Sequence, residues 1–399
     1  FPTASLRPEP IPVDVKVVLI GSPLEYRLLW LLDDDVRELF KVKADFTPEL
    51  DWDAAGDAYA AFASRWVRDQ GLRHLDRGAV ARLVEHGARL TEDQRKVSTR
   101  LIELSDAISE ASHWAGVAGR AVVAAEDVER AIAEREYRAN LVEERVRAFI
   151  ADGTIMIDTD GGRVGQVNGI SVLDLGDHVF GRPARISARV APGRGGAKSI
   201  EREIELSGPI HSKGVLVVDG YLAGTYGASE PLALDATLTF EQSYDEVEGD
   251  SASSTELYAL LSALSGLPVA QGIGVTGSVN QHGEVQAVGG VTHKVEGFFA
   301  TCKAGGLTGD QGVIVPAVNA RNLMLDDEVV EAVRDGRFHV WAIRTVEEGI
   351  ELLTGCPAGV PDAQGRYPDD TVHGRVQARL EAYADTLREL LADGEDGRA

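Results

Sequence analysis

A sharp change of residue pattern near Gly153 constrains the fold of this 399-residue chain more than any other feature of its sequence. Residues 53–149 are rich in Ala, Arg, Glu and Leu, and apolar residues such as Leu101, Leu104 and Ile108 recur there at helical spacing. After Gly153, glycine-rich turns separate short runs of valine and isoleucine, which are typical of strands. We therefore predict an all-helical module of four or so helices, followed by a separate domain of mixed α and β structure.

The first 52 residues predict a smaller α/β segment. Residues 15–20 have the pattern of a short buried strand, residues 24–32 that of a helix, and residues 40–46 alternate like a second strand. A lone strand cannot bury both of its faces, so this segment is predicted to be the remnant of an α/β domain.

The remaining sequence predicts a separate α+β or α/β domain over residues 151–355, and then a linker and a C-terminal helix over residues 356–399. Together with residues 1–52 and 53–150, these ranges give four predicted segments. The predicted strands are 164–167, 186–190, 200–206, 215–218, 234–240, 313–315 and 338–343, and the predicted helices are 251–265, 291–304 and 326–335. The last helix has an apolar stripe from Val372 to Leu391, which is typical of a packing or oligomer seam.

Charge and composition exclude several classes of partner. The formal charge of -24 at pH 7 argues against nucleic acid and anionic membranes, because phosphates would be repelled. No apolar run approaches the roughly 18 residues of a spanning helix, and the Pro-rich residues 1–12 lack the apolar stretch of a signal peptide. Two cysteines, Cys302 and Cys356, fit a reducing compartment, so we expect the cytoplasm. The chain does not begin with Met, which leaves open an upstream segment that was removed.

A serine before the predicted helix at residues 251–265 is the first candidate for chemistry. Asp250 and Ser251 are both good N-cap residues, and one interpretation is that they only cap this helix. The other interpretation is that the serine is functional. A serine at a helix N-terminus lies beside N–H groups that can hold an oxyanion. The sequence pattern alone leaves both interpretations open.

A nucleophilic hydroxyl also needs a base, and the candidate here is a lysine. No G-x-S-x-G elbow accompanies any of the nine histidines, and no serine begins an S-x-x-K motif. Lys294 follows Gly289 and Gly290 in the first turn of a predicted helix, where the helix dipole and partial burial disfavour its charged form. The alternative is an ordinary surface lysine. No metal is predicted, because the chain has neither H-E-x-x-H nor a cluster of Cys and His.

Together the two motifs resemble a known family. The run Gly-Asp-Ser-Ala-Ser around Ser251, with Val-Gly-Gly-Val-Thr-x-Lys ending at Lys294, is similar to the proteolytic domain of Lon proteases, and most similar to the LonB-like branch and its ATP-independent LonC-like relatives. Residues 208–215 and 220–222 are similar to the strand pair that borders the active site in that family. The resemblance extends over residues 168–354 and implies a Lon-type α+β proteolytic domain.

The resemblance also implies the roles of particular residues. It implies a serine endopeptidase with a Ser–Lys dyad, in which Ser251 is the nucleophile, Lys294 is its general base and Thr276 orients the lysine by a hydrogen bond. Glu248 and Asp250 match acidic positions near the dyad, for which the alternative is ordinary loop carboxylates. The implied substrates are unfolded proteins and peptides, and the implied assembly is a homo-oligomeric ring, expected to be a hexamer.

The nucleotide site of such proteases is the remaining question. A phosphate cradle requires G-x-x-x-x-G-K-[ST], and the nearest match, residues 193–199, has Ala197 before Lys198 and is predicted to be a flexible loop. Residues 1–140 nevertheless resemble the back half of this family's AAA+ module, with its small helical subdomain. We therefore expect no cofactor and no need of ATP. A non-catalytic chaperone-like or adaptor ring, and the protease-bearing fragment of an ATP-driven protease, stay open as alternatives.

Overall fold

The computed structural model describes residue 9, residues 11–227 and residues 232–396, with side chains up to residue 390. Most of residues 1–12, on which the predicted lack of a signal peptide rests, lie outside this description. The chain divides into two compact units, Phe1–Thr47 and Pro48–Ala399. The predicted segment boundary at residue 52 lies at the start of the first long helix of the second unit, and the boundary at residue 150 lies at the end of its fifth.

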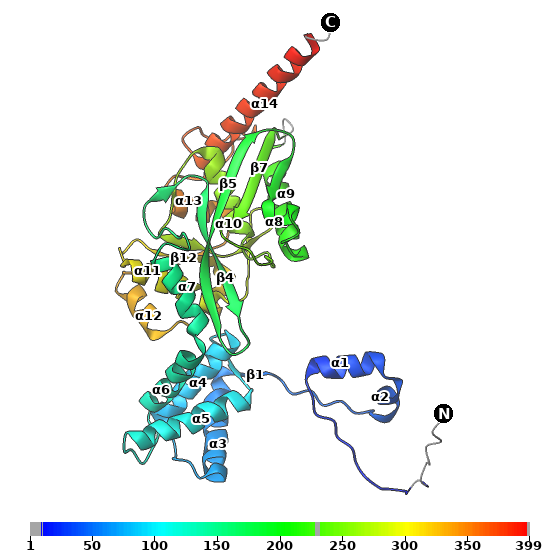
Figure 1. Cartoon of the computed structure of the whole chain (residues 1–399), viewed down its shortest axis with the longest axis vertical. Helices are drawn as coiled ribbons and strands as arrows, with labels where there is room; N and C mark the ends of the chain where they lie inside the picture. The colour runs from blue at the N-terminus through cyan, green and yellow to red at the C-terminus, as the bar shows by residue number, and fades with distance from the viewer. Residues whose placement is uncertain (1–8, 10, 228–231, 397–399) are drawn as a thin grey trace. The chain divides into compact units, whose positions relative to one another are not determined.

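The first unit contains the helices α1 (Pro23–Leu32) and α2 (Asp34–Leu39) (Figure 1). Ser22 and Glu25 form a capping box at the start of α1, which confirms the helix predicted at residues 24–32. The strands predicted at 15–20 and 40–46 are wrong, and Val15 and Ile20 are 66% and 96% exposed. A strand needs hydrogen bonds to a neighbouring strand, and the described part of this unit offers no such neighbour.

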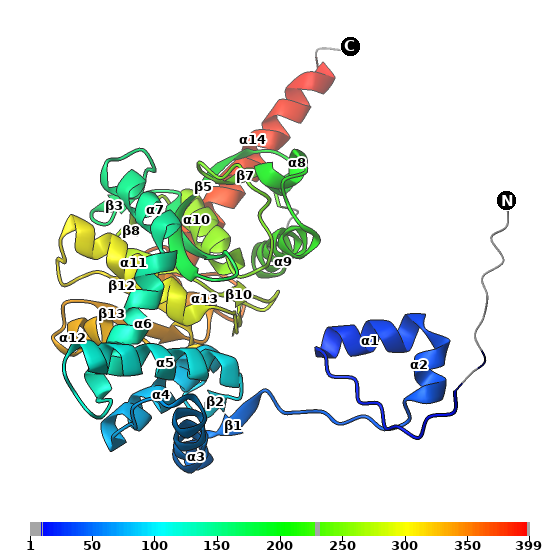
Figure 2. The same ribbon diagram turned by 60° about the horizontal axis from the view of Figure 1, so that its bottom comes forward.

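The second unit begins with a set of helices at one end of the unit (Figures 1 and 2). These helices are α3 (Trp52–Gln70), α4 (Arg77–Thr91), α5 (Leu101–Val117) and α6 (Ala125–Ala139), and α7 (Leu141–Ala151) follows them and lies beside α11. A short antiparallel pair, β1 (Glu49–Asp51) and β2 (Lys96–Ser98), joins α3 to α4 and α5. Buried side chains at helical spacing, such as Leu83, Leu104 and Ile108, form one core between α3, α4, α5 and α6. We call β1, β2 and these four helices the helical subdomain.

A seven-stranded, mostly parallel sheet organises the rest of the second unit, in the order β13-β12-β9-β4-β5-β7-β6. Its strands are β4 (Gln166–Asp174), β5 (Val179–Pro192), β6 (Gly196–Ser199), β7 (Leu234–Phe240), β9 (Ile273–Val275), β12 (Gly312–Pro316) and β13 (His339–Ile343). Within this sheet, the β4–β5 and β5–β7 pairs are antiparallel and the other pairs are parallel. Two short antiparallel pairs stand beside it: β3 (Gly162–Arg163) with β8 (Val269–Ala270), and β10 (Ser278–Val279) with β11 (Val285–Gln286).

Helices cover both faces of this sheet. They are α8 (Ile200–Glu203), α9 (Pro209–Tyr226), α10 (Ser253–Ser265), α11 (Val291–Gly305), the 3-10 helix η1 (Ala317–Asn322), α12 (Asp327–Arg334), α13 (Val346–Thr354) and α14 (Val372–Asp396). On β12, Ile314 belongs to the core that α9, α10, α13 and α14 share, whereas Val313 and Val315 belong to the core under α11 and α12. Because side chains alternate along a strand, α10 and α11 therefore lie on opposite faces. Among the described helices, none is long and apolar enough to cross a membrane.

Several elements differ from the sequence predictions. Residues 200–203 and 215–218 are helical, in α8 and α9, and the predicted strand pair at 208–222 is a single helix. The buried residues Val215, Val218 and Leu222 have helical spacing, which a short apolar run conceals. The loop predicted at 193–199 ends in β6, which pairs with β7. The first half of α14 packs into the core through Val372 and Val376, as predicted, whereas the side chain of Leu391 lies outside the described residues.

Candidate active site

Ser251 lies in the turn between β7 and α10, and it does not cap the helix. The helix begins at Ser253, its N-cap residue is Ala252, and no side chain caps it. The interpretation of Asp250 and Ser251 as mere capping residues is therefore wrong. The Ser251 carbonyl accepts a hydrogen bond from the Gly277 amide at 2.9 Å, which fixes the turn against the segment that follows β9.

Lys294 lies in the first turn of α11, which packs on the face of the sheet opposite to α10. The N-cap residue of α11 is Gly290, whose φ of +65° favours glycine, and its carbonyl accepts from the Lys294 amide at 3.0 Å. The helix approaches β5 very closely, because an added Cβ on Gly297 would overlap the carbonyl of Gly181. This close packing brings the base of the Lys294 side chain up to the sheet.

The Lys294 amine and the Ser251 hydroxyl meet beyond the carboxyl end of β9. Lys294 Nζ lies 3.0 Å from Ser251 Oγ and 3.0 Å from Thr276 Oγ1, and Thr276 is the first residue after β9. The Thr276 hydroxyl also lies 3.4 Å from the Ser251 carbonyl oxygen. The side chains of Lys294 and Thr276 are buried, with residue exposures of 3% and 1%. The three residues that the sequence predicted to meet are therefore in contact, while their catalytic roles stay predictions.

The surroundings of Lys294 favour its uncharged form. Burial lowers the pKa of the Lys294 amine from 10.5 to about 8, while the negative charges of Glu92 and Asp250 act in the opposite direction. Desolvation thus outweighs the two carboxylates. With this pKa roughly one amine in ten is neutral at pH 7, and the amine is in hydrogen-bond contact with a hydroxyl group.

The two acidic residues predicted near the dyad lie in different places. Asp250 accepts a hydrogen bond from Ser278 Oγ at 2.9 Å, and it lines a pocket of about 280 Å³ together with residues that include Lys213 and His282. Glu248 is exposed and lies over Gly208, at the start of α9. Among the hydrogen bonds of the described residues, neither carboxylate contacts the side chain of Ser251 or Lys294. Asp250 therefore adjoins the site, whereas Glu248 does not reach the dyad.

A second polar cluster, which the sequence did not reveal, lies between α9 and α10. His211 Nδ1 lies 2.7 Å from Ser207 Oγ, and His211 Nε2 lies 3.1 Å from Glu256 Oε1. The order of contacts is that of a Ser-His-acid triad. However, His211 and Glu256 are buried, with exposures of 1% and 0%, so a polypeptide substrate cannot reach the imidazole. We interpret this cluster as a polar contact that holds α9 against α10.

Three family models match separate parts of the chain. Residues 1–47 match the LonB-like AAA domain, and residues 74–138 match the AAA+ ATPase LID domain of archaeal LonB. Residues 246–354 match the C-terminal proteolytic domain of Lon protease (S16). The last match includes Ser251 and Lys294, and together the three models cover more than half of the chain.

Curated relatives agree with these matches. A protein of Escherichia coli named as a Lon protease homologue is 44% identical over 249 residues, which are 62% of this chain and 42% of the relative. One from Haemophilus influenzae is 32% identical over 385 residues, which are 94% of this chain and 62% of the relative. The archaeal Lon protease of Thermoplasma volcanium is 29% identical over 366 residues, which are 88% of this chain and 52% of the relative. The chain thus spans about half the length of these relatives, and it belongs to the LonB-like branch of the Lon protease family.

Proposed function

We propose that this chain is a serine endopeptidase in which Ser251 is the nucleophile and Lys294 is its general base. The observation that supports this most strongly is the buried amine of Lys294, 3.0 Å from the Ser251 hydroxyl. Its hydrogen-bond partners among the described residues are hydroxyl groups, so no carboxylate hydrogen-bonds to the amine to stabilise its charged form. Such an amine is a base rather than half of an ion pair.

The reaction follows from this contact. The neutral Lys294 amine takes the hydroxyl proton as Ser251 Oγ attacks the peptide carbonyl carbon, and the resulting oxyanion forms near the N-terminus of α10. The Lys294 ammonium, still hydrogen-bonded to Thr276, then gives its proton to the departing amine nitrogen, and an acyl-enzyme ester remains. A water molecule, deprotonated by the neutral amine, attacks this ester and releases the carboxylic acid product. The same proton returns to Ser251 Oγ.

The proposed substrates are unfolded proteins and peptides. The phosphate-cradle motif G-x-x-x-x-G-K-[ST] occurs nowhere in the 399 residues, so we propose that this chain cleaves them without ATP and needs no cofactor. The proposed assembly is a homo-oligomeric ring, expected to be a hexamer. The free thiols of Cys302 and Cys356 are compatible with the reducing cytoplasm, which we retain as the proposed location.

Cleavage of casein and of fluorogenic peptides, with and without ATP and magnesium, tests this proposal. We expect cleavage without nucleotide, and we expect Ser251→Ala and Lys294→Ala to abolish it. Lys303→Ala is the matched control, because Lys303 is an exposed lysine on the same helix that pairs with Glu328 at the surface.

Each other outcome has a defined meaning. Substantial activity in Ser251→Ala or Lys294→Ala would contradict the dyad. Cleavage that depends on nucleotide would favour the fragment of an ATP-driven protease. Peptide binding without cleavage under any condition would favour the adaptor ring.

A further inference from the structure

A residue of the helical subdomain reaches the helix that bears Lys294. Glu92 is the C-cap residue of α4 and has a φ of +49°, which is uncommon for a residue with a side chain. Its Oε2 atom accepts a hydrogen bond from the Gly290 amide at 3.2 Å, and its Oε1 atom lies 3.7 Å from His293 Nε2. Its main-chain carbonyl accepts from Asn322 Nδ2 at 2.7 Å. The side chain and the main chain of Glu92 therefore both contact residues of the predicted proteolytic domain, 151–355.

The position of these contacts on α11 is what matters for Lys294. Gly290 is the N-cap residue of α11, so the Glu92 carboxylate accepts from one of the amides that a helix N-terminus leaves without an internal partner. The carbonyl of the same Gly290 accepts from the Lys294 amide. Glu92 thus holds the residue against which the backbone of Lys294 is hydrogen-bonded.

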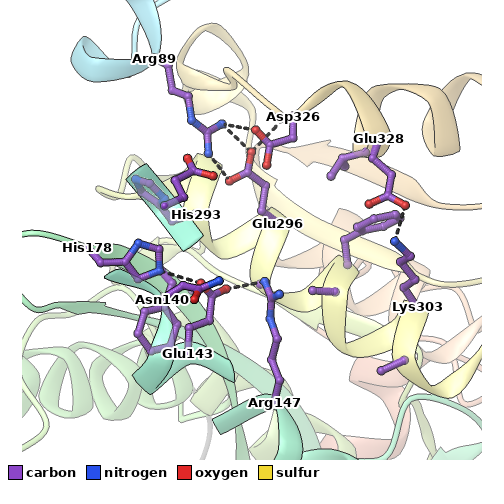
Figure 3. Close-up of a pocket in the computed structure, with 18 residues that line it drawn as sticks. Arg89, Asn140, Glu143, Arg147, His178, His293, Glu296, Lys303, Asp326 and Glu328 are labelled. Atoms are coloured by element: carbon purple, nitrogen blue, oxygen red, sulfur yellow. Dashed lines mark hydrogen bonds and ion pairs between the residues drawn. The ribbon is translucent and has the colours of Figure 1, made fainter. Parts of the chain in front are cut away.

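The end of α4 contacts the same region at further points. Arg89 makes a bidentate contact with Glu296, with N–O distances of 2.6 and 2.8 Å (Figure 3). Arg89 also donates a hydrogen bond to the Met324 carbonyl. Gln94 Nε2 donates to the Leu323 carbonyl at 2.8 Å. These contacts flank Lys294 on α11 and fix the segment after η1. Hydrogen bonds and an ion pair therefore connect the end of α4 to the first two turns of α11.

The loop before α11 is held from its other side by η1. Asn319 exchanges two hydrogen bonds with the main chain of Val288, both at 2.9 Å. Thr292 Oγ1 donates to the Asn322 carbonyl at 2.9 Å. Asn322 also donates a hydrogen bond to the Glu92 carbonyl. Glu92 and η1 therefore hold residues 288–292 from two sides.

We infer that Glu92 is a positioning residue for Lys294: it fixes the first turn of α11 so that the amine points at Ser251 Oγ. The helical subdomain then helps to set the geometry of the dyad. The inference rests on the proposed function of Ser251 and Lys294. Glu92 does not line the pocket beside Asp250, so its loss should lower kcat and leave KM nearly unchanged.

Glu92 also affects Lys294 through its charge. The negative charges of Glu92 and Asp250 both raise the pKa of Lys294 against the larger effect of burial, and His293 is the titratable neighbour on α11 itself. Glu92→Gln keeps an oxygen that can accept from the Gly290 amide but removes the charge. Glu92→Ala removes both. The two variants therefore separate the hydrogen bond from the electrostatic effect.

The test measures peptide cleavage and backbone hydrogen exchange in Glu92→Ala and Glu92→Gln. We expect kcat of Glu92→Ala to fall about tenfold or more, because a small misplacement of a catalytic group is costly, and KM to stay within about twofold. Glu92→Gln should keep kcat within about threefold, since the hydrogen bond is retained, and its activity should titrate at lower pH than the wild type. The control is Glu85→Ala, which removes a surface partner of Arg82 on the same helix and should not change kcat.

Hydrogen exchange separates this inference from the proposed function. Peptides that cover residues 288–296 should exchange faster in Glu92→Ala than in the wild type, whether or not the protein cleaves peptides. Absence of cleavage by the wild type would refute the proposed function and leave the hydrogen-exchange test available. Unchanged exchange of residues 288–296 in Glu92→Ala would overturn the inference even in that case. With an active wild type, a Glu92→Ala variant whose kcat matches that of Glu85→Ala overturns the inference. Should Glu92→Ala fail to fold, Glu92→Met, which keeps the length of the side chain without its carboxylate, takes its place, and a kcat equal to that of Glu85→Ala then overturns the inference.

Discussion

The burial of one lysine determines what the hydroxyl of Ser251 can do. Desolvation lowers the pKa of Lys294 to about 8, although Glu92 and Asp250 favour the charged form. A lysine with its ordinary pKa of 10.5 would be almost fully protonated near neutral pH and could not accept a proton. The balance between burial and the two carboxylates therefore sets the pH range in which Lys294 can act as the proposed base.

The pH dependence of cleavage follows from this balance. Lys294 must be neutral to act as a base, so kcat/KM should rise with pH and reach half of its maximum near pH 8. The profile should be measured between about pH 6 and about pH 10 with a neutral peptide, so that substrate ionisation does not contribute. A flat profile, or one that falls through pH 8, would contradict the role of a lysine base.

The same burial should reduce stability. Because the pKa of Lys294 is lower in the folded chain than in the unfolded chain, the unfolded state binds more protons between about pH 8 and pH 10.5, and stability is lost as the pH falls through this range. Lys294→Met removes this cost and should raise the free energy of unfolding at pH 7 by up to about 3 kcal/mol. Urea unfolding measures this difference in the free energy of unfolding between the variant and the wild type, and the difference should shrink toward pH 10. A Lys294→Met variant less stable than the wild type at pH 7 would show that the two hydrogen bonds outweigh the burial cost.

Sequence alone predicted part of this site. Ser251, Lys294 and Thr276 lie in motifs with a specific spacing, so their meeting could be expected before any coordinates. The position of Glu248 over Gly208 could not, because a loop carboxylate has several rotamers and no pattern marks its direction. Glu92 lies 202 positions before Lys294, in a segment without a motif, and only the packing of the two subdomains reveals it.

At the scale of elements, the contact between α11 and β5 is the tightest constraint on the lysine. Gly297 faces the carbonyl of Gly181, and an added Cβ on either glycine would overlap the other segment. No flexible side chain is available there to move aside. The helix can sit this close to the sheet only because both positions are glycine.

Gly297→Ala should therefore displace α11 and lower both stability and cleavage. We expect a loss of about 1–3 kcal/mol in the free energy of unfolding, as for other overpacked sites, and a fall in kcat because Lys294 moves with the helix. Gly289→Ala is the matched control, because a Cβ there meets nothing within 4 Å and the backbone is not left-handed. Equal behaviour of the two variants in urea unfolding and peptide cleavage would refute this account of the contact.

Elements were predictable where the apolar pattern was long, and less so where it was short. The helices α10, α11 and α12 and the strands β7, β12 and β13 agree with the sequence predictions to within a few residues. Residues 215–218 were predicted as a strand because four consecutive apolar residues fit either a strand or a buried helix, and only the longer run to Tyr226 shows a helix. Residues 15–20 have a strand composition but no partner strand among the described residues.

At the scale of the whole molecule, the fold class was predictable and the arrangement of layers was not. The change of pattern at Gly153 separates the helical part from the sheet, and the family matches divide the chain in a similar way. The order of the seven strands depends on pairings far apart in sequence, such as β4 with β9, which local patterns do not encode. The placement of α10 and α11 on opposite faces likewise emerges only from the assembled sheet.

The proposed ring gives a prediction at this scale. Light scattering after size exclusion should give a mass of several copies of the 42.7 kDa chain, with six copies expected. Ser251→Ala should give the same mass, because it removes one hydroxyl group from a turn of the proposed active site and leaves the fold unchanged. A monomer at micromolar concentration would contradict the ring without affecting the dyad.

Covalent labelling with a fluorophosphonate probe tests the central claim most directly, because it reports the nucleophile without a substrate. The account predicts that one serine per chain is modified, that mass spectrometry locates the label on Ser251, and that Lys294→Ala loses nearly all labelling while Lys303→Ala keeps it. Labelling of a different serine, or undiminished labelling of Ser251 in Lys294→Ala, would contradict the account.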